Sequence, residues 1–410
     1  MSRQLNILYN KEVAASLSHN EFGYLQLNYD KNWLNSKNSC AISSNLPLSD
    51  ITYREEDFKN FFLGILPENH NKDIIANIFE IGVGNYFDLL EKIGGECPGA
   101  ISFINNDNGI IDDNYQYKKL SELELYQLIK QLPQNPLLAG QDQIRFILSG
   151  ERSKIAICID DEGSIFLPLN NSPSTHILKP QFNGFSNYVI NSAICLDLAQ
   201  LCQINAINAV IGVIGDIECL LVERYDRKFT KNNQLIKIHQ EDFCQILKLS
   251  PQNKYQQDQG PSLYDCFNIL KHNCSVPAAN MSIFLNMVLF NLLIGNNRAH
   301  GKNFSLIYHK NVVKIAPLYD AFSTLYYNDT SQIMAMSIGG QYNCNEIGIK
   351  EIELFCNECS LSFPLVKKRI YDLSKKILFN IDQLSIKYQD GKDIIEFIKA
   401  RSEIFYHKFK

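Results

Sequence analysis

The fold is decided by the stretch Ile294-Gly295-Asn296-Asn297-Arg298-Ala299-His300-Gly301-Lys302-Asn303-Phe304-Ser305, together with Pro317-Leu318-Tyr319-Asp320. Asp320 follows Asn303 by seventeen residues, with a pair of strand-like segments at 304–315 between them. Amide and carboxylate oxygens are ligands that Mg²⁺ accepts. We therefore predict that Asn303 and Asp320 bind magnesium.

The spacing inside this stretch is that of a protein-kinase active site, with one exception. In kinases a catalytic Asp lies five residues before a magnesium-binding Asn, and a later Asp at a strand end binds the magnesium that bridges the phosphates. Five residues before Asn303 the chain has Arg298, a permanent cation that cannot accept a proton from a substrate hydroxyl. The expected Arg298 contacts are an ion pair with Asp320, which would compete with magnesium, or the γ-phosphate.

Two more side chains of the stretch are candidates for the same site. Lys302 would reach the γ-phosphate as a mobile cation, and a solvated lysine is the equally weighted alternative. His300 is predicted among the ATP-binding residues, but we give it no acid–base role, because a lone His near a loop is more often a structural hydrogen-bonding group.

Composition limits the function classes. The chain has 410 residues, 45% of them hydrophobic, a formal net charge of −5 and a pI near 5.9, which argues against direct nucleic-acid binding by a basic surface. The apolar run at 281–294 is shorter than the roughly twenty residues of a membrane span, and the N-terminus has no apolar signal core, so we expect a cytoplasmic protein without membrane contact. The twelve cysteines are expected to be reduced.

Residues 1–110 are predicted to form a small α+β module. Alternating patterns at 5–9 and 24–29 indicate strands, and apolar residues at helical spacing indicate helices at 55–66, 72–81 and 88–93. A turn cluster at 105–109 and an irregular segment at 133–140 place a domain boundary between them. We therefore predict a connecting segment at 111–140.

The rest of the chain has the element order of a two-lobed kinase. Residues 141–225 are predicted as a small lobe with strands at 145–148, 154–159, 175–178, 206–214 and 218–223 and a helix at 188–202. Residues 226–410 are predicted as an all-helical large lobe, apart from the strand pair near 304–315. The fold class is thus α+β, a two-lobed protein-kinase-like fold with an added N-terminal module.

Two further segments fit nucleotide binding. Lys179 ends the apolar strand that begins at Thr175, where a kinase lysine pairs with ATP phosphates, although a solvated strand-end lysine is the more common case. The strand at 220–223 continues into a charged turn, and the backbone at Glu223 and Tyr225 is a candidate adenine hinge. The alternative is a strand that simply ends in a charged turn.

Together these motifs resemble one family. Residues 61–67 read Phe-Phe-Leu-Gly-Ile-Leu-Pro and residues 94–100 read Gly-Gly-Glu-Cys-Pro-Gly-Ala, and the segments 175–179, 222–227, 240–245, 295–305 and 317–320 complete the pattern. Along nearly its whole length the chain resembles the HipA family, the serine/threonine kinase toxins of bacterial toxin–antitoxin pairs.

The resemblance implies ATP and Mg²⁺ as cofactors and assigns roles to single residues. It places Lys179 and the phosphate-loop residues Ser149, Gly150 and Lys154 at ATP, Glu223 and Tyr225 at the adenine hinge, and Asn303 and Asp320 on magnesium. It also implies a small helix-turn-helix antitoxin similar to HipB as partner, DNA contact only through that antitoxin, and as substrate a serine of a cytoplasmic protein, with translation proteins suggested.

Three departures from the family pattern weaken the implied activity. The phosphate loop, usually Gly-x-Gln-x-Lys, reads Gly150-Glu151-Arg152-Ser153-Lys154, and Ile147 stands where the family has its autophosphorylated serine. The small-lobe helix has Asn191-Ser192 where a Glu usually pairs with the strand lysine, which leaves Lys179 without that partner unless Asp160, Asp161 or another acid substitutes. The third departure is Arg298.

Because the changes affect three separate elements of the ATP site, we favour a kinase that has lost or changed its activity naturally. The alternative is an active kinase in which only the catalytic base has been replaced. Two functions stay open: a toxin kinase with impaired or absent phosphotransfer, and a pseudokinase that acts by binding an antitoxin or another kinase.

Overall fold

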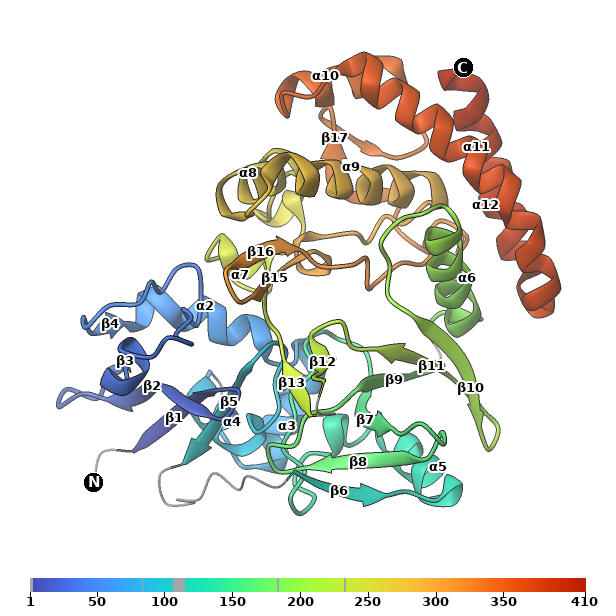
Figure 1. Ribbon diagram of the computed structural model, residues 1–410. Coiled ribbons are helices and arrows are strands. Elements are labelled where there is room, and N and C mark those ends of the chain that lie inside the picture. The colour runs from blue at the N-terminus through green and yellow to red at the C-terminus, as the bar shows by residue number, and fades with distance from the viewer. Residues whose placement is uncertain (1–2, 83, 106–114, 183, 232–233) are drawn as a thin grey trace.

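The N-terminal module is an antiparallel five-stranded sheet covered by helices (Figure 1). The computed structural model describes residues 3–82, 84–105, 115–182, 184–231 and 234–410. The strand order is β4-β3-β2-β1-β5, with β1 Gln4–Tyr9, β2 Glu12–His19, β3 Leu25–Tyr29, β4 Tyr53–Arg54 and β5 Ile101–Asn105. The helices are α1 Lys31–Leu34, α2 Glu55–Ile65, α3 Asn69–Ile78 and α4 Tyr86–Ile93. The predicted strands and helices of this module are confirmed, and β2, β4, β5 and α1 are additional elements.

The small lobe is a six-stranded sheet with the order β10-β11-β9-β7-β8-β6. Its strands are β6 Gln116–Lys119, β7 Ile155–Ile159, β8 Ile165–Leu169, β9 His176–Pro180, β10 Ala209–Ile214 and β11 Ile217–Glu223. The segment predicted as a connection carries β6 and α5, Glu122–Gln131, and β6 pairs with β8 as an edge strand. All four β6 residues are exposed, so no apolar alternation marks this strand in the sequence.

The strand predicted at 145–148 is wrong. These residues are irregular, and the Ile147 N–H donates to the Glu96 carbonyl at 2.7 Å, which attaches the segment to the N-terminal module. Their apolar side chains are buried, as in a strand, but their backbone bonds go to a loop. Of the predicted turn at 105–109 only Asn105, the last residue of β5, is among the described residues.

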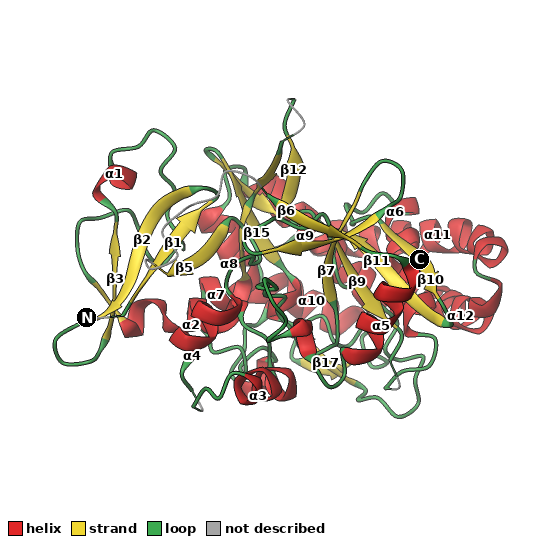
Figure 2. Cartoon of the chain, turned by 90° about the horizontal axis from the view of Figure 1, so that it is seen from below, coloured by secondary structure: helices red, strands yellow, loops and turns green. Residues whose placement is uncertain are grey.

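The large lobe is mainly helical, but the predicted all-helical lobe is wrong (Figure 1). Its helices are α7 Phe243–Ile246, α8 Leu263–Asn273, α9 Pro277–Ile294, α10 Ile349–Glu358, α11 Phe363–Lys387 and α12 Lys392–Phe409. Its strands are β12 Arg227–Phe229, β13 Leu235–Lys237, β14 His239–Asp242, β15 Ser305–His309, β16 Val312–Ile315, β17 Ile333–Ile338 and β18 Gln341–Asn343. Most are too short to show a periodic pattern. The five-stranded sheet and the α11–α12 pair lie at opposite ends of the molecule (Figure 2).

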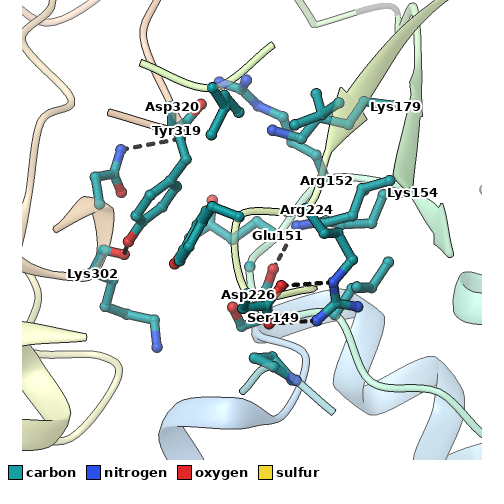
Figure 3. Close-up of a pocket in the computed structure, with 18 of the residues that line it drawn as sticks. Ser149, Glu151, Arg152, Lys154, Lys179, Arg224, Asp226, Lys302, Tyr319 and Asp320 are labelled. Atoms are coloured by element: carbon teal, nitrogen blue, oxygen red, sulfur yellow. Dashed lines mark hydrogen bonds and ion pairs between the residues drawn. The ribbon is translucent and has the colours of Figure 1, made fainter. Parts of the chain in front are cut away.

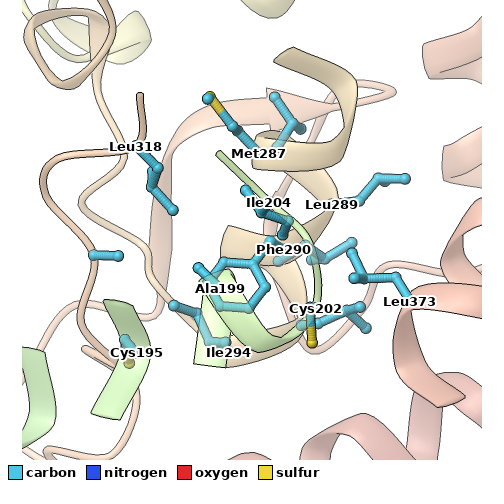
Figure 4. Packing of buried hydrophobic residues seen from close by; sticks show 14 of the residues in the cluster. Cys195, Ala199, Cys202, Ile204, Met287, Leu289, Phe290, Ile294, Leu318 and Leu373 are labelled. Atoms are coloured by element: carbon cyan, nitrogen blue, oxygen red, sulfur yellow. The ribbon is translucent and has the colours of Figure 1, made fainter. Parts of the chain in front are cut away.

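Helix α6, Tyr188–Leu201, connects the lobes because it is apolar around most of its circumference. Figure 4 shows Cys195 and Ala199 of α6 packed near Phe290 and Ile294 of α9, within one core that also includes Leu373 of α11. Helix α9 is the one helix in the described ranges that is long and apolar enough to cross a membrane by length and composition, and 61% of it is buried inside the protein. It packs against α8, α11 and α12 as a core helix.

Buried ion pairs attach the N-terminal module to the segment that follows β11. Arg224 Nη1 lies 3.1 Å from Glu96 Oε2, and Arg227 forms a second ion pair with Glu96. Asp226 neutralises the same two arginines and accepts a hydrogen bond from the Gly99 N–H at 2.8 Å. All four charged side chains are almost completely buried. The segment predicted as the adenine hinge is therefore held by the N-terminal module as well as by the small-lobe sheet.

Candidate active site

One pocket is lined by every residue that the sequence predicted for the site. Figure 3 draws part of this lining, including Lys154, Lys179 and Asp320. Its lining includes Ser149, Gly150, Lys154, Lys179, Glu223, Tyr225, Arg298, His300, Lys302, Asn303 and Asp320. The phosphate loop and β9 contribute the lysines, the end of β11 contributes the hinge, and the segments on either side of β15 and β16 contribute Asn303 and Asp320. Segments as far apart in the sequence as Ser149 and Asp320 thus meet at one cavity.

The predicted magnesium ligands are adjacent. Asn303 Nδ2 donates a hydrogen bond to Asp320 Oδ2 at 3.0 Å. Burial alone would raise the pKa of Asp320, but Lys179, followed by Arg152, lowers it below its ordinary value, so the carboxylate is ionised. The described residues include no group of three or more His, Cys, Asp or Glu that could hold a metal unaided. The Asn303 amide and the Asp320 carboxylate therefore fit a Mg²⁺ ion whose remaining ligands would be phosphate oxygens and water.

The expected ion pair between Arg298 and Asp320 is not formed. Its Nη2 lies 3.6 Å from Oε2 of Glu151 in the phosphate loop, and about a third of each side chain is exposed. Glu151 Oε1 also accepts from Lys254 Nζ at 2.7 Å and from Asn69 Nδ2 at 2.9 Å. Arg298 turns toward Glu151, which is already held at the pocket rim by Lys254. The base position is thus occupied by a cation that is paired with the phosphate loop.

Lys302 is a structural residue, which contradicts its prediction as a mobile cation. Its Nζ donates to the Gly64 carbonyl at 2.7 Å and to Asp242 Oδ2 at 3.0 Å, and it lies 3.6 Å from Glu68 Oε1. The side chain is 5% exposed and points away from Asp320 (Figure 3). Burial lowers the pKa of Lys302, but Asp242 and Glu68 more than compensate and raise it above its ordinary value. Lys302 joins the N-terminal module to the large lobe.

His300 is half-buried and neutral. Burial, reinforced by Lys254, lowers the pKa of His300 to about 3. The ring contacts Tyr255 edge-on, with 5.1 Å between ring centroids, and its Nδ1 has no hydrogen-bond partner among the described residues. A His that stays uncharged at neutral pH donates or accepts hydrogen bonds without moving a net charge. This agrees with assigning it no acid–base role.

The two lysines of the phosphate site lie close enough to affect each other. Burial, and next the charge of Lys179, lowers the pKa of Lys154 to about 7, and Lys154 Nζ donates to the Ser149 carbonyl. Lys179 forms no ion pair with a carboxylate among the described residues. Asp160 does not substitute for the missing acid, because its Oδ1 accepts from the Ser164 N–H at 2.7 Å within its own turn, and Asp161 is exposed there.

Asn191 of α6 has a different role from the acid it replaces. Its Nδ2 donates to the Ser323 carbonyl at 3.0 Å, and its Oδ1 accepts from the Ser323 N–H at 2.7 Å. Both atoms are buried, so the pair fixes the backbone three residues after Asp320. Helix α6 is therefore connected to the Asp320 segment directly and not through Lys179.

The hinge segment presents an aromatic surface and backbone groups to the pocket. The Glu223 N–H donates to the Asn208 carbonyl at 3.0 Å, and the Glu223 carboxylate accepts from Asn208 Nδ2 at 2.7 Å. The Tyr225 N–H has no acceptor within the described part of the chain. The Tyr225 ring stacks on Tyr319, with centroids 5.2 Å apart and planes at 25°. An adenine hinge at this segment stays a prediction.

Sequence reasoning missed the charged residues that organise the pocket rim. Lys254 and Glu68 form a buried ion pair at 2.6 Å and connect to Glu151 and Lys302. Glu68 directly follows the quoted segment 61–67, which was the only available signal, whereas Lys254 lies in a polar loop with no pattern of its own. For Arg152, the sequence showed only that it stands where the phosphate-loop pattern has a Gln, and gave no role for its side chain.

Comparisons with known proteins show which family the chain belongs to. The family model of the HipA-like C-terminal domain matches residues 146–380, and that of the HipA N-terminal domain matches residues 5–104. Y4mE of Sinorhizobium fredii is 33% identical over 375 residues, covering 90% of this chain and 89% of the relative. The serine/threonine-protein kinase toxin HipA of Shewanella oneidensis is 29% identical, covering 86% and 82%.

The solved structures extend the likeness to the fold. The Shewanella oneidensis HipA structure, determined in complex with HipB and operator DNA, matches with a TM-score of 0.86 at 25% identity, covering 99% of this chain and 98% of that one. The fold is thus the kinase-like fold of HipA, with its N-terminal module. The chain belongs to the HipA family.

Proposed function

We propose that this chain is a toxin–antitoxin protein that binds ATP with Mg²⁺ and transfers the γ-phosphate to a protein serine only slowly or not at all. Support for ATP binding comes from Asn303 and Asp320 at 3.0 Å and from Lys154 and Lys179 facing them across one pocket. The observation that carries the impairment is the Arg298–Glu151 ion pair, which holds a cation at the position of the base.

The chemistry of the residues explains the expected loss. Bound ATP and Mg²⁺ would supply the phosphoryl group and the charge that neutralises it. Asp320 and Asn303 would hold the metal, and Lys154 and Lys179 would bind phosphate oxygens. A serine hydroxyl needs an acceptor for its proton, which a guanidinium cannot be, and general-base catalysis contributes roughly 10²- to 10⁴-fold. Transfer in this site would lack that contribution.

The test is phosphate transfer from γ-labelled ATP with magnesium into a bacterial extract. The native chain is compared with Arg298→Asp and with the double variant Glu151→Gln/Arg298→Asp. The double variant is needed because Arg298→Asp alone places a second carboxylate beside Glu151, and like charges raise each other's pKa. Asp320→Asn in the double variant is the negative control, and thermal melting confirms that each variant is folded.

We expect little or no labelling by the native chain and a rise of about 10²-fold or more in the double variant. Labelling by the native chain at the rate of the double variant would show that Arg298 does not impair transfer. Silence of all variants, with ATP still bound, would favour the second candidate, a pseudokinase that acts by binding.

We further infer that a small helix-turn-helix protein similar to HipB is the partner. The support is the Shewanella HipA structure with HipB and operator DNA, which this chain matches over nearly its full length. The net charge of −5 implies that DNA contact occurs through the antitoxin. Gel-shift titration should show no operator binding by the chain alone, and a slower band only when a HipB dimer is present. Direct binding of the chain to DNA would contradict this.

A further inference from the structure

Arg152 of the phosphate loop lies in a cage of aromatic rings. Its guanidinium carbon is 4.2 Å from the ring centroid of Tyr188 and 4.5 Å from that of Phe322. Phe182 and Phe185 lie at 5.2 and 5.7 Å. Within the described ranges the guanidinium has neither an ion pair nor a hydrogen bond, so its N–H donors are unused. Cation–π contact holds the side chain in place without consuming those donors.

The cage combines rings from two segments that border the pocket. Tyr188 is the first residue of α6, and Phe322 lies two residues after Asp320. The two rings contact each other edge-on at 5.4 Å, so they form one cluster. Arg152 therefore connects the phosphate loop to both α6 and the Asp320 segment, a connection that the Lys179 side chain does not make here.

The charges around Asp320 are unbalanced in favour of an anion. Among the described residues Arg152, Lys154 and Lys179 form no ion pair, and Asp320 is the carboxylate that all three act on, whereas Lys254, Arg298 and Lys302 are paired with Glu68, Glu151 or Asp242, and Arg224 with Glu96 and Asp226. Three cations against one carboxylate leave two positive charges when Lys154 is protonated. The magnesium complex of ATP carries about two negative charges and that of ADP about one, so the triphosphate neutralises the site and the diphosphate does not.

We propose that Arg152 binds the terminal phosphate of the nucleotide and makes this pocket select a nucleoside triphosphate over the diphosphate. Figure 3 shows Arg152 and Lys179 on the Asp320 side of the pocket, where Asp320 would hold the magnesium of a bound nucleotide. The aromatic cage orders the side chain before binding, so less conformational entropy is lost when the phosphate arrives. Arg152 thus compensates in binding for the Gln that the loop lacks.

This inference rests on the proposed ATP binding. Calorimetric titration with MgATP and MgADP compares the native chain with Arg152→Gln, Arg152→Lys and the surface control Arg54→Gln, which removes one positive charge from the N-terminal module. Arg152→Lys keeps the charge but loses the planar fork that suits phosphate. Thermal melting without nucleotide reports whether a variant has lost stability.

We expect the native chain to prefer ATP over ADP by about tenfold or more, and Arg152→Gln to lower ATP affinity by about tenfold while ADP affinity changes by less than about twofold. Arg152→Lys should be intermediate, and Arg54→Gln should match the native chain. Equal losses for ATP and ADP, or no loss, would overturn the role of Arg152 alone. Absence of any nucleotide binding by the native chain would overturn the proposed ATP site itself.

Discussion

Replacing Lys302 with Met separates a structural role of this lysine from a phosphate-binding one. The substitution removes the charge that contacts Gly64, Asp242 and Glu68 while keeping a long side chain. Breaking a buried ion pair by removing one partner costs about 3–5 kcal/mol. Asp242 still accepts from the Gln245 N–H and Glu68 still pairs with Lys254, which favours the lower end of that range.

The loss translates into a measurable shift. An unfolding entropy of about 2.1 cal/mol/K per residue gives roughly 0.9 kcal/mol/K for this chain, so Lys302→Met should lower the melting temperature by about 3–6 °C. Differential scanning fluorimetry measures that shift, and a MgATP titration below the melting temperature should show unchanged affinity. Lys350→Met, an exposed lysine of α10, is the matched control and should melt like the native chain. A normal melting temperature combined with weaker ATP binding would refute the structural assignment.

Three further predictions concern the pocket. Lys154, with its pKa near 7, should bind phosphate better when protonated, so ATP affinity should fall about tenfold between pH 6 and pH 8 and Lys154→Arg should flatten that profile in calorimetry. His300 is held neutral with its pKa near 3, so above pH 6.5 it is uncharged in both the folded and the unfolded chain and its ionisation does not affect stability; as pH falls from 6.5 toward 3 the unfolded chain takes up the proton and stability is lost by up to about 1.4 kcal/mol per unit, so His300→Gln should show a shallower acid denaturation curve. Asn191→Glu should restore neither Lys179 pairing nor phosphotransfer and should lower the melting temperature, because the buried Nδ2 donor to Ser323 is lost at about 1–3 kcal/mol; a gain in labelling would contradict this.

The location of the site could be predicted because it depends on the spacing of residues along the sequence. Asn303 and Asp320 stand on either side of a β-hairpin, which brings their side chains within 3.0 Å. The lysine at the end of β9 and the segment after β11 follow from strand positions in the same way. All eleven predicted residues line one pocket.

The direction of individual side chains could not be predicted. Lys302 points away from Asp320 because Glu68 and Asp242, which are distant in the sequence, offer it buried carboxylates. Arg298 turns toward Glu151 for the same reason. Charged side chains follow the nearest opposite charge, and the sequence does not show which distant segments supply it. The aromatic cage of Arg152 likewise combines rings from 182–188 and from 322.

The buried charges between Glu96 and the hinge limit how such proteins can be recombined. The family models divide the chain between residues 104 and 146, yet the carboxylate of Glu96 lies on one side of that division and its arginines, Arg224 and Arg227, lie on the other. A chimera that brings an N-terminal module from a relative works only if it carries an acid at this position. Without one, two guanidinium groups next to the hinge share only the charge of Asp226. An N-terminal module can thus be exchanged between relatives only if its acid and the two arginines of the other part are both kept.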